Sequence, residues 1–264
     1  MTRIDHLAAL ADLQQRFLDT TRRADPATPI PWLGRWKVEQ LVVHLARIHH
    51  WAAAQARCEQ ERPLGRGPFA DLPGLYAECA AELRATLAEL DPDARAWALV
   101  DDGVPRGEQT GTVRFWHRRQ LHETLVHLWD LRTAVGEPLG VDGTLSADGT
   151  LSADDALGAD DAFAADEALW LDCLDEVVTV MHPRQLRLER VPPPAARLVF
   201  RPAGADASLA LTGAPDGAAE IVIAGPARSL ALLAWGRLGL AAEGIEVRGD
   251  RDLAAAVLDA GLTP

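Results

Sequence analysis

Apolar residues recur at helical spacing through the first half of the chain. In the first segment Ile4, Leu7, Leu10, Leu13 and Phe17 follow one another at intervals of three and four residues. This interval is typical of an amphipathic helix that buries one face. Similar patterns return after the proline-rich stretch ADPATPIPW. Together they predict four helices, near residues 4–17, from about 37 to 58, from near 73 to 90, and from about 113 to 135.

The pattern changes in the last third of the chain. The stretch ADEALWLDCLDEVVTVM at 165–181 predicts a fifth helix, and VPPPAA at 191–196 then interrupts regular structure. After the prolines, short apolar runs separated by Gly, Pro and Asp are typical of strands. Asp250 and Gly261 flank the last helical segment as a predicted N-terminal cap and C-terminal stop. The order predicted for residues 192–264 is β-β-β-α-β-α, with strands in 197–202, 207–212, 219–225 and 245–249 and helices in 226–238 and 250–261.

The two patterns divide the chain into two predicted domains. A helical domain would cover residues 1–188, and a small mixed domain would cover 192–264, with the prolines between them. The fold class expected is α+β. Within the helical part, an acidic insert at 142–168 repeats GTLSAD in tandem, and we interpret it as an exposed loop. A cation-binding tract is a weaker interpretation, because the closing Glu of an EF-hand loop is missing.

Composition and charge narrow the class of protein. The 264 residues are 48% hydrophobic and carry a net charge of −13, and such an acidic surface repels nucleic acids and anionic membranes. Three widely spaced cysteines without a CxxC pair favour reduced thiols. Neither a signal peptide nor a membrane-spanning run is apparent. We therefore expect a cytoplasmic protein, monomeric or weakly dimeric, whose partners are small molecules.

The stretch HETLVHLWD at 122–130 carries the candidate chemistry. On a helix, Glu123 and His127 lie one turn apart on a stripe beside the apolar face. His44 falls within the apolar face of the helix at 37–58. Taken singly, a solvated Glu–His pair and a satisfied core histidine are the ordinary interpretations. Together the three residues predict a metal site, because facing helices of a bundle build metal sites from inward His and Glu side chains.

Two His and one Glu leave a coordination position open, which is typical of catalytic zinc rather than structural zinc. Other divalent metals fit the same donor set. Two neighbouring residues have alternative interpretations. Asp130 either accepts the second ring N–H of a histidine ligand or forms a salt bridge to an arginine. Arg119 either pairs with Glu123 or binds an anionic substrate or cofactor.

Several motifs resemble known families. The stretch WKVEQLVVHLARIHHW at 36–51 resembles the second helix of the DinB/YfiT-like superfamily. The stretch FWHRRQLHETLVHLWDLRTAVG at 115–136 is similar to the mycothiol-dependent maleylpyruvate isomerase family of actinobacteria. VVTVMHPRQL at 177–186, LALLAWGRL at 230–238 and VRGD at 247–250 resemble that family as well. The resemblance covers nearly the whole chain.

The resemblance implies a DinB-like four-helix bundle followed by a small sterol-carrier-like α/β domain. It implies zinc held by His44, Glu123 and His127, and a substrate-binding arginine in the second domain, for which Arg237 is the candidate. The implied chemistry is addition of a metal-activated thiol, mycothiol, to an electrophile such as maleylpyruvate. Cys58, Cys79 and Cys173 lie outside the ligand motifs, so the thiol would come from the cosubstrate, and the three cysteines are expected to pack within helices.

Other functions remain open at this point. The same scaffold would serve a mycothiol S-transferase acting on a different electrophile. A non-enzymatic binder or regulator, with an apolar ligand in the second domain and a vestigial metal site, is the alternative from another class. A metal-dependent hydrolase would need a general base, and Asp130 would have to face the metal to provide one.

Overall fold

The structure is a computed structural model that describes residues 4–137, 167–204 and 208–263. Its described residues form two compact units. The helical unit consists of residues 4–98 and 112–137. The sheet unit consists of residues 99–111, 167–204 and 208–263. The predicted α+β class is confirmed, since a helical N-terminal region precedes a small mixed sheet.

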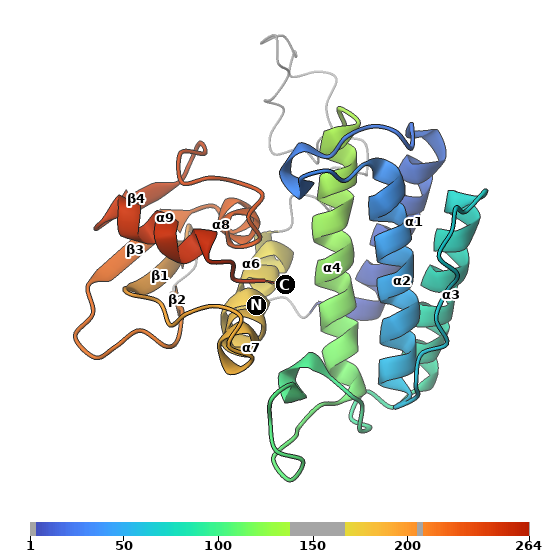
Figure 1. Ribbon diagram of the computed structural model, residues 1–264, viewed down its shortest axis with the longest axis horizontal. Helices are drawn as coiled ribbons and strands as arrows, with labels where there is room; N and C mark the ends of the chain where they lie inside the picture. The colour runs from blue at the N-terminus through green and yellow to red at the C-terminus, as the bar shows by residue number, and fades with distance from the viewer. Residues whose placement is uncertain (1–3, 138–166, 205–207, 264) are drawn as a thin grey trace. The chain divides into compact units, whose positions relative to one another are not determined.

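Four long helices make up the helical unit, as the apolar spacing predicted. Helix α4 packs against α1 and α2, and α3 packs against α2 and α1, which closes a four-helix bundle (Figure 1). The turn between α1 and α2 contains a short 3-10 helix, η1 (Pro31–Leu33). The helices are α1 (His6–Arg23), α2 (Val38–Ala56), α3 (Leu72–Glu89) and α4 (Val113–Ala134).

Local sequence fixes where these helices begin and end. The Asp5 carboxylate accepts from the backbone N–H of Ala8 at the start of α1, and Asp71 accepts from Gly74 at the start of α3. Such caps satisfy backbone donors that have no partner within the helix. Helix α4 is followed by Gly136 at φ +79°, a left-handed conformation that favours glycine. The bundle core is apolar and includes the fully buried Phe17, Leu41, Leu45, Tyr76, Leu83 and Trp116.

The sheet unit has a four-stranded mixed sheet with the order β2-β1-β3-β4. β1 (Arg197–Pro202) and β3 (Glu220–Gly225) run parallel at its centre. The edge strands β2 (Leu209–Ala210) and β4 (Glu246–Arg248) pair antiparallel with them. With α8 (Ala227–Ala234) and α9 (Arg251–Asp259), the order along the chain is the predicted β-β-β-α-β-α. Helix α8 packs on β1 and β3, so the sheet has a helical layer against it.

The boundary between the units differs from the one predicted at the prolines. The predicted fifth helix is observed as α6 (Glu167–Glu176), a π-helical turn η3 (Val177–Met181) and α7 (His182–Arg187), and all three belong to the sheet unit. The reason is packing: α6 contacts α8, and the Glu167 carboxylate accepts from the Ala227 N–H at 2.8 Å. Sequence periodicity identifies the helix but does not show which core it joins.

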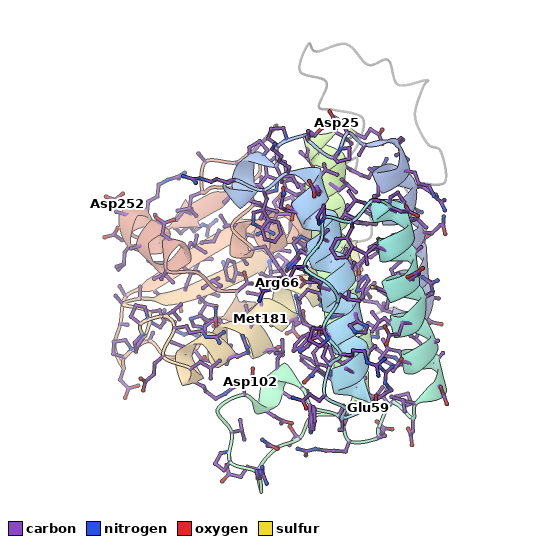
Figure 2. The ribbon with its side chains drawn as sticks, turned by 45° about the vertical axis from the view of Figure 1, so that its right-hand side comes forward. Asp25, Glu59, Arg66, Asp102, Met181 and Asp252 are labelled. Atoms are coloured by element: carbon purple, nitrogen blue, oxygen red, sulfur yellow. The ribbon has the colours of Figure 1, made fainter. Side chains whose placement is uncertain are left out.

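The segment 99–111, between α3 and α4, also groups with the sheet unit. It begins with the 3-10 helix η2 (Leu99–Asp101). The Arg184 Nε donates to the Asp102 carboxylate at 2.7 Å, and Arg187 donates to the carbonyls of Val100 and Asp102. Asp102 is labelled in Figure 2. Two arginines of α7 thus bind this segment to the unit that follows it in the chain.

Two expectations concern the rest of the chain. Residues 142–166 of the acidic insert lie outside the described residues, and 167–168 form the start of α6. No helix in the described parts combines the length and the apolar composition that a membrane crossing requires.

Candidate metal centre

The structure brings together the three residues predicted as ligands. His44 comes from α2, and Glu123 and His127 come from α4, which packs against it. Each residue offers one donor atom, and the three atoms lie within 4.8 Å of one another. The side chains of Glu123 and His127 are only 9% and 6% exposed, whereas that of His44 is 31% exposed. The cluster is therefore buried on the α4 side and accessible to solvent at His44.

The two separations from Glu123 Oε1 match the edges of a coordination tetrahedron. Glu123 Oε1 lies 3.4 Å from His44 Nε2 and 3.2 Å from His127 Nε2. Zinc–nitrogen and zinc–oxygen bonds of about 2.0–2.1 Å set two tetrahedral ligand atoms about 3.3 Å apart. A charge-assisted hydrogen bond between the same groups would be shorter, at about 2.7–2.9 Å. The residues present therefore fit a divalent metal with three protein ligands.

The second oxygen of Glu123 is held by an arginine. Arg119, one turn earlier on α4 and 4% exposed, pairs with Oε2 of Glu123. Burial would raise the pKa of the Glu123 carboxyl, but the Arg119 guanidinium and the two histidines hold it well below its usual value. Of the two interpretations of Arg119, the structure shows the pairing with Glu123. This pairing keeps the carboxylate ionised and leaves Oε1 facing both histidines.

His127 is oriented by a buried carboxylate on the other side of its ring. Its Nδ1 lies 2.8 Å from Oδ2 of Asp130, while its Nε2 faces Glu123. Trp32, on η1, donates its indole N–H to Oδ1 of the same carboxylate. Burial lowers the pKa of His127, yet its bonds to Asp130 and Glu123 give a net rise. Asp130 thus contacts the side of the His127 ring that faces away from Glu123, and its role in orienting a metal ligand stays a prediction.

At the exposed edge of the cluster, aromatic rings contact His44. The ring of Trp36, eight residues before His44, meets the imidazole edge-on at 5.0 Å between centroids. The imidazoles of His44 and His127 lie 5.1 Å apart and nearly perpendicular, at 85°. The Trp–His spacing of the WKVEQLVVH stretch therefore places the indole on His44, where it limits the rotation of the imidazole.

Residues that the sequence interpretation missed lie around this cluster. Trp32 was missed because its contact with Asp130 joins residues 98 positions apart. His49 and Gln120 form another unpredicted pair in the bundle core, with His49 Nδ1 2.8 Å from Gln120 Oε1. The sequence offered one signal for His49: it lies on the same apolar helix as His44, five residues further on. Burial lowers its pKa to about 4, so it is neutral at neutral pH.

The remaining predicted site residue belongs to the sheet unit. Arg237 follows α8, donates to the Trp235 carbonyl at 2.7 Å, and places its guanidinium 5.7 Å from the centroid of the Trp235 ring. These contacts hold the Arg237 guanidinium beside Trp235. Its role as a substrate-binding arginine stays a prediction.

The cysteines do not contribute to the cluster. Cys79 and Cys173 are buried as expected, and burial raises the pKa of the Cys79 thiol to about 11, so it is protonated at neutral pH. Cys58 differs from the expected helix-packing role. It lies just beyond the end of α2 at φ +55°, half-buried, with its sulfur 3.6 Å from the Arg95 carbonyl.

Comparison with known structures identifies the fold. The chain is similar to a crystal structure of the mycothiol-dependent maleylpyruvate isomerase, with a TM-score of 0.57 and 14% identity over 94% of each chain. A histidine-to-alanine variant of that isomerase gives a TM-score of 0.54 with the same identity and coverage. At this identity the likeness establishes the architecture of the two units.

Sequence comparison then identifies the family. Residues 7–132 match the N-terminal domain of mycothiol maleylpyruvate isomerase, and residues 163–256 match the C-terminal domain of the same family. The chain therefore belongs to the mycothiol-dependent maleylpyruvate isomerase family, as its motifs indicated. No curated protein matches its sequence.

Proposed function

We propose that this protein is a metal-dependent enzyme that uses mycothiol to isomerise a cis double bond in a small anionic electrophile of the maleylpyruvate type. The observation that carries the proposal is the geometry of His44, Glu123 and His127. Their three donor atoms lie within 4.8 Å of one another, the two separations from Glu123 Oε1 match a tetrahedral edge, and one side is accessible to solvent. The donor set would hold zinc, with its fourth position left for an exogenous group.

The charges around the cluster favour a dication. Glu123 supplies a carboxylate that is ionised at neutral pH, and Asp130 supplies a second buried carboxylate behind His127. Arg119 neutralises part of this charge, so Glu123 would bind through Oε1 alone. Trp32 and Asp130 hold the His127 ring so that Nε2 faces the cluster. The chain thus fixes two ligands before any metal arrives, and His44 completes the site from the other helix.

A bound divalent metal would lower the pKa of a thiol placed at its open position, which generates the nucleophilic thiolate at neutral pH. The thiol has to be exogenous, because neither Cys79 nor Cys173 is exposed and Cys58 lies at the end of α2. The family to which the chain belongs is named for mycothiol, which supports mycothiol as the cosubstrate.

The proposed reaction conserves atoms. The sulfur adds to one carbon of the cis double bond, and the electron pair moves into the adjacent carbonyl. The remaining carbon–carbon single bond rotates. The electron pair then returns from the carbonyl oxygen, which expels the sulfur as thiolate and restores the double bond in the trans form. Arg237 is proposed to hold a substrate carboxylate, a task for which the planar guanidinium fork is suited.

The first test is the metal content of the full chain, purified without chelators or a histidine tag. We expect one equivalent of zinc in the wild-type protein, its loss in His44→Ala, and its retention in the matched control His50→Gln on the same helix. Protein that stays metal-free even after incubation with zinc would overturn the proposed site. The proposed site would also be overturned if His44→Ala bound zinc as tightly as the wild-type protein.

The second test separates isomerase from S-transferase by the mass of the product. Zinc-loaded protein is incubated with mycothiol and maleylpyruvate. An isomerase gives a trans product of unchanged mass and leaves the mycothiol concentration constant. A transferase consumes mycothiol and gives an adduct heavier by one mycothiol. Absence of both products with zinc bound would overturn the proposed reaction while leaving the metal site standing.

A further inference from the structure

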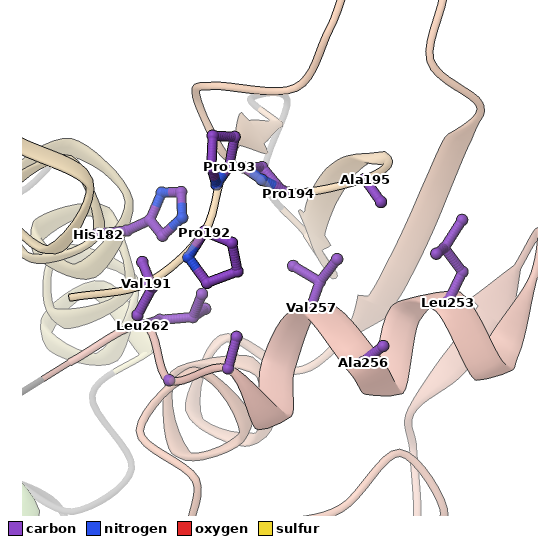
Figure 3. Close-up of a pocket in the computed structure, with 12 residues that line it drawn as sticks. His182, Val191, Pro192, Pro193, Pro194, Ala195, Leu253, Ala256, Val257 and Leu262 are labelled. Carbon is purple, nitrogen blue, oxygen red and sulfur yellow. The ribbon is translucent and has the colours of Figure 1, made fainter. Parts of the chain in front are cut away.

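A second concave site lies wholly within the sheet unit. A cavity of about 190 Å³ opens between the proline run after α7 and helix α9 (Figure 3). Its walls are almost entirely alkyl, and they carry no Asp, Glu, Lys or Arg side chain. The lining residues with larger apolar side chains are Val191, Pro192, Pro194, Leu253, Val257 and Leu262.

One polar side chain interrupts this apolar lining. His182, at the start of α7, projects its imidazole toward Pro192 and Pro193 (Figure 3). The residue is 2% exposed, and its Nδ1 is buried without a hydrogen-bond partner among the described residues. Burial lowers the pKa of His182, so the ring is neutral at neutral pH. Buried polar atoms are nearly always hydrogen-bonded, because an unpaired one loses its hydration without compensation.

The wall facing this ring offers it no N–H donor from the proline run. Three consecutive prolines, Pro192 to Pro194, have no backbone N–H to donate. The opposite wall on α9 presents Leu253 and Val257, whose side chains have no polar atoms. His182 is also the residue that directly follows the π-helical turn η3, a feature that is frequent at functional sites. His182 is therefore the one side chain with polar atoms among the described residues that line this apolar cavity.

We propose that this cavity binds one small, uncharged ring compound that carries a hydroxyl group, with the hydroxyl on His182. An apolar cavity of about 150 Å³ is large enough to hold benzene, so the observed volume suits a single substituted ring. An anion or cation would lose its hydration there without meeting a charge, which excludes ionic ligands. A hydroxyl both donates and accepts, so it can pair with either tautomer of the neutral imidazole.

The ligand would enter beside α9. Ala256 and Ala260 contribute to the lining yet are themselves exposed, so the rim of the cavity is at this helix. Both are small residues, which leaves the entrance wide. The site shares no residue with the His44, Glu123 and His127 cluster, and it does not depend on the proposed isomerase activity.

Methyl and imidazole NMR of the full chain, titrated with phenol, tests this site. We expect saturable shifts of the Val257 and Leu253 methyls and of the His182 ring, and no such shifts with benzoate. In His182→Phe, phenol should bind about five- to tenfold more weakly, the range expected for one lost hydrogen bond, while toluene affinity stays within about twofold. Ala256→Trp, a change at an exposed position, should block both compounds.

Each variant is first compared with the wild-type protein by its methyl spectrum, so that a folding defect is recognised. Because Ala256→Trp leaves His182 and the core intact, it tests the location of the site even if His182→Phe does not fold. Absence of saturable shifts with phenol would overturn the proposal. Benzoate binding as tightly as phenol, or unchanged phenol affinity in Ala256→Trp, would overturn it as well.

Discussion

The carboxylate of Asp130 contacts the Nδ1 of His127 at 2.8 Å, on the side of the ring opposite Glu123. Asp130 is fully buried, and its other oxygen accepts from the Trp32 indole. One carboxylate therefore sets both the ring orientation of His127 and the tautomer that leaves Nε2 available as a ligand atom. Because Asp130 contacts the far side of the His127 ring, a hydrolase would need another general base.

Asp130→Asn should weaken zinc binding by about 10- to 100-fold, the usual effect of losing a carboxylate behind a histidine ligand. The amide keeps the size of the side chain but no longer stabilises the Nδ1–H of His127. Zinc affinity is measured by competition with a chromophoric chelator. Trp32→Phe is the matched control, since it removes the other contact of Asp130 and should reduce affinity less. Equal zinc affinity in Asp130→Asn and wild type would show that Asp130 has no part in the site.

The candidate ligand cluster was predictable because each of its two helices carries a local signal. Glu123 and His127 are one turn apart on one helix, and His44 interrupts an apolar face. The contacts that refine the site are not local: Trp32 meets Asp130, and His49 meets Gln120, across 98 and 71 positions. Spacing along a helix gives the face on which a residue lies. It does not give the partner that another helix brings to that face.

The same limit applies to the prediction of the fold. The strands and helices of the sheet unit follow the predicted order, because period-two and helical patterns are set by neighbouring residues. The boundary between the units was not predictable in this way. Helix α6 joins the sheet unit through its contacts with α8, and segment 99–111 joins it through Arg184 and Arg187. Both associations depend on tertiary packing that leaves no periodic signal.

The predicted cap of the last helix can be tested by substitution. The Asp250 carboxylate accepts from the backbone N–H groups of Asp252 and Leu253. Asp250→Ala should reduce the free energy of unfolding by about 1 kcal/mol, the usual cost of losing an N-cap. Asp259→Ala, at the other end of α9, is the control. It should leave stability unchanged or slightly higher, because a negative charge near a helix C-terminus is unfavourable. Urea unfolding measures both, and equal losses would contradict the capping role.

His50 should stabilise the bundle most at mildly acidic pH. Its Nδ1 lies 2.6 Å from Glu82 on α3, and its Nε2 lies 2.8 Å from the Arg62 carbonyl. Burial lowers its pKa, but these two partners give a net rise. The stabilisation is therefore complete below the unfolded pKa of 6.5 and is lost as pH rises through the folded pKa. His50→Gln should abolish this decline, which is expected to stay within about 1 kcal/mol for a partly exposed pair.

Unfolding by urea from pH 5.5 to 8.5, on metal-free protein, measures this decline. Glu82, the partner of His50, affects the free energy of unfolding at more acidic pH. Burial raises its pKa, but His50 and Arg57 give a net fall, so its contribution is present above pH 4.5 and is lost below it. A wild-type protein whose stability did not fall relative to His50→Gln above pH 6.5 would contradict the assigned shift.

The neighbouring His49 should have the opposite pH dependence. It is fully buried, and burial lowers its pKa from 6.5 to about 4, against the opposing hydrogen bond to Gln120. Between these values the unfolded chain takes up a proton that the folded chain excludes, so stability falls as pH decreases from 6.5 to 4 and levels off below. A shift of this size corresponds to roughly 3 kcal/mol.

His49→Gln should flatten the free energy of unfolding across this interval, whatever its stability at neutral pH, because glutamine does not titrate. The comparison is made on metal-free protein between pH 4 and 7.5, with His50→Gln as the control that retains His49. The two histidines are adjacent in sequence, and residue type and formal charge do not distinguish them. They differ in burial, since His49 faces the bundle core and His50 faces Glu82 near the surface. If His49→Gln kept the wild-type slope, His49 would have to be protonated or solvated in the folded bundle, and its burial beside Gln120 would be refuted.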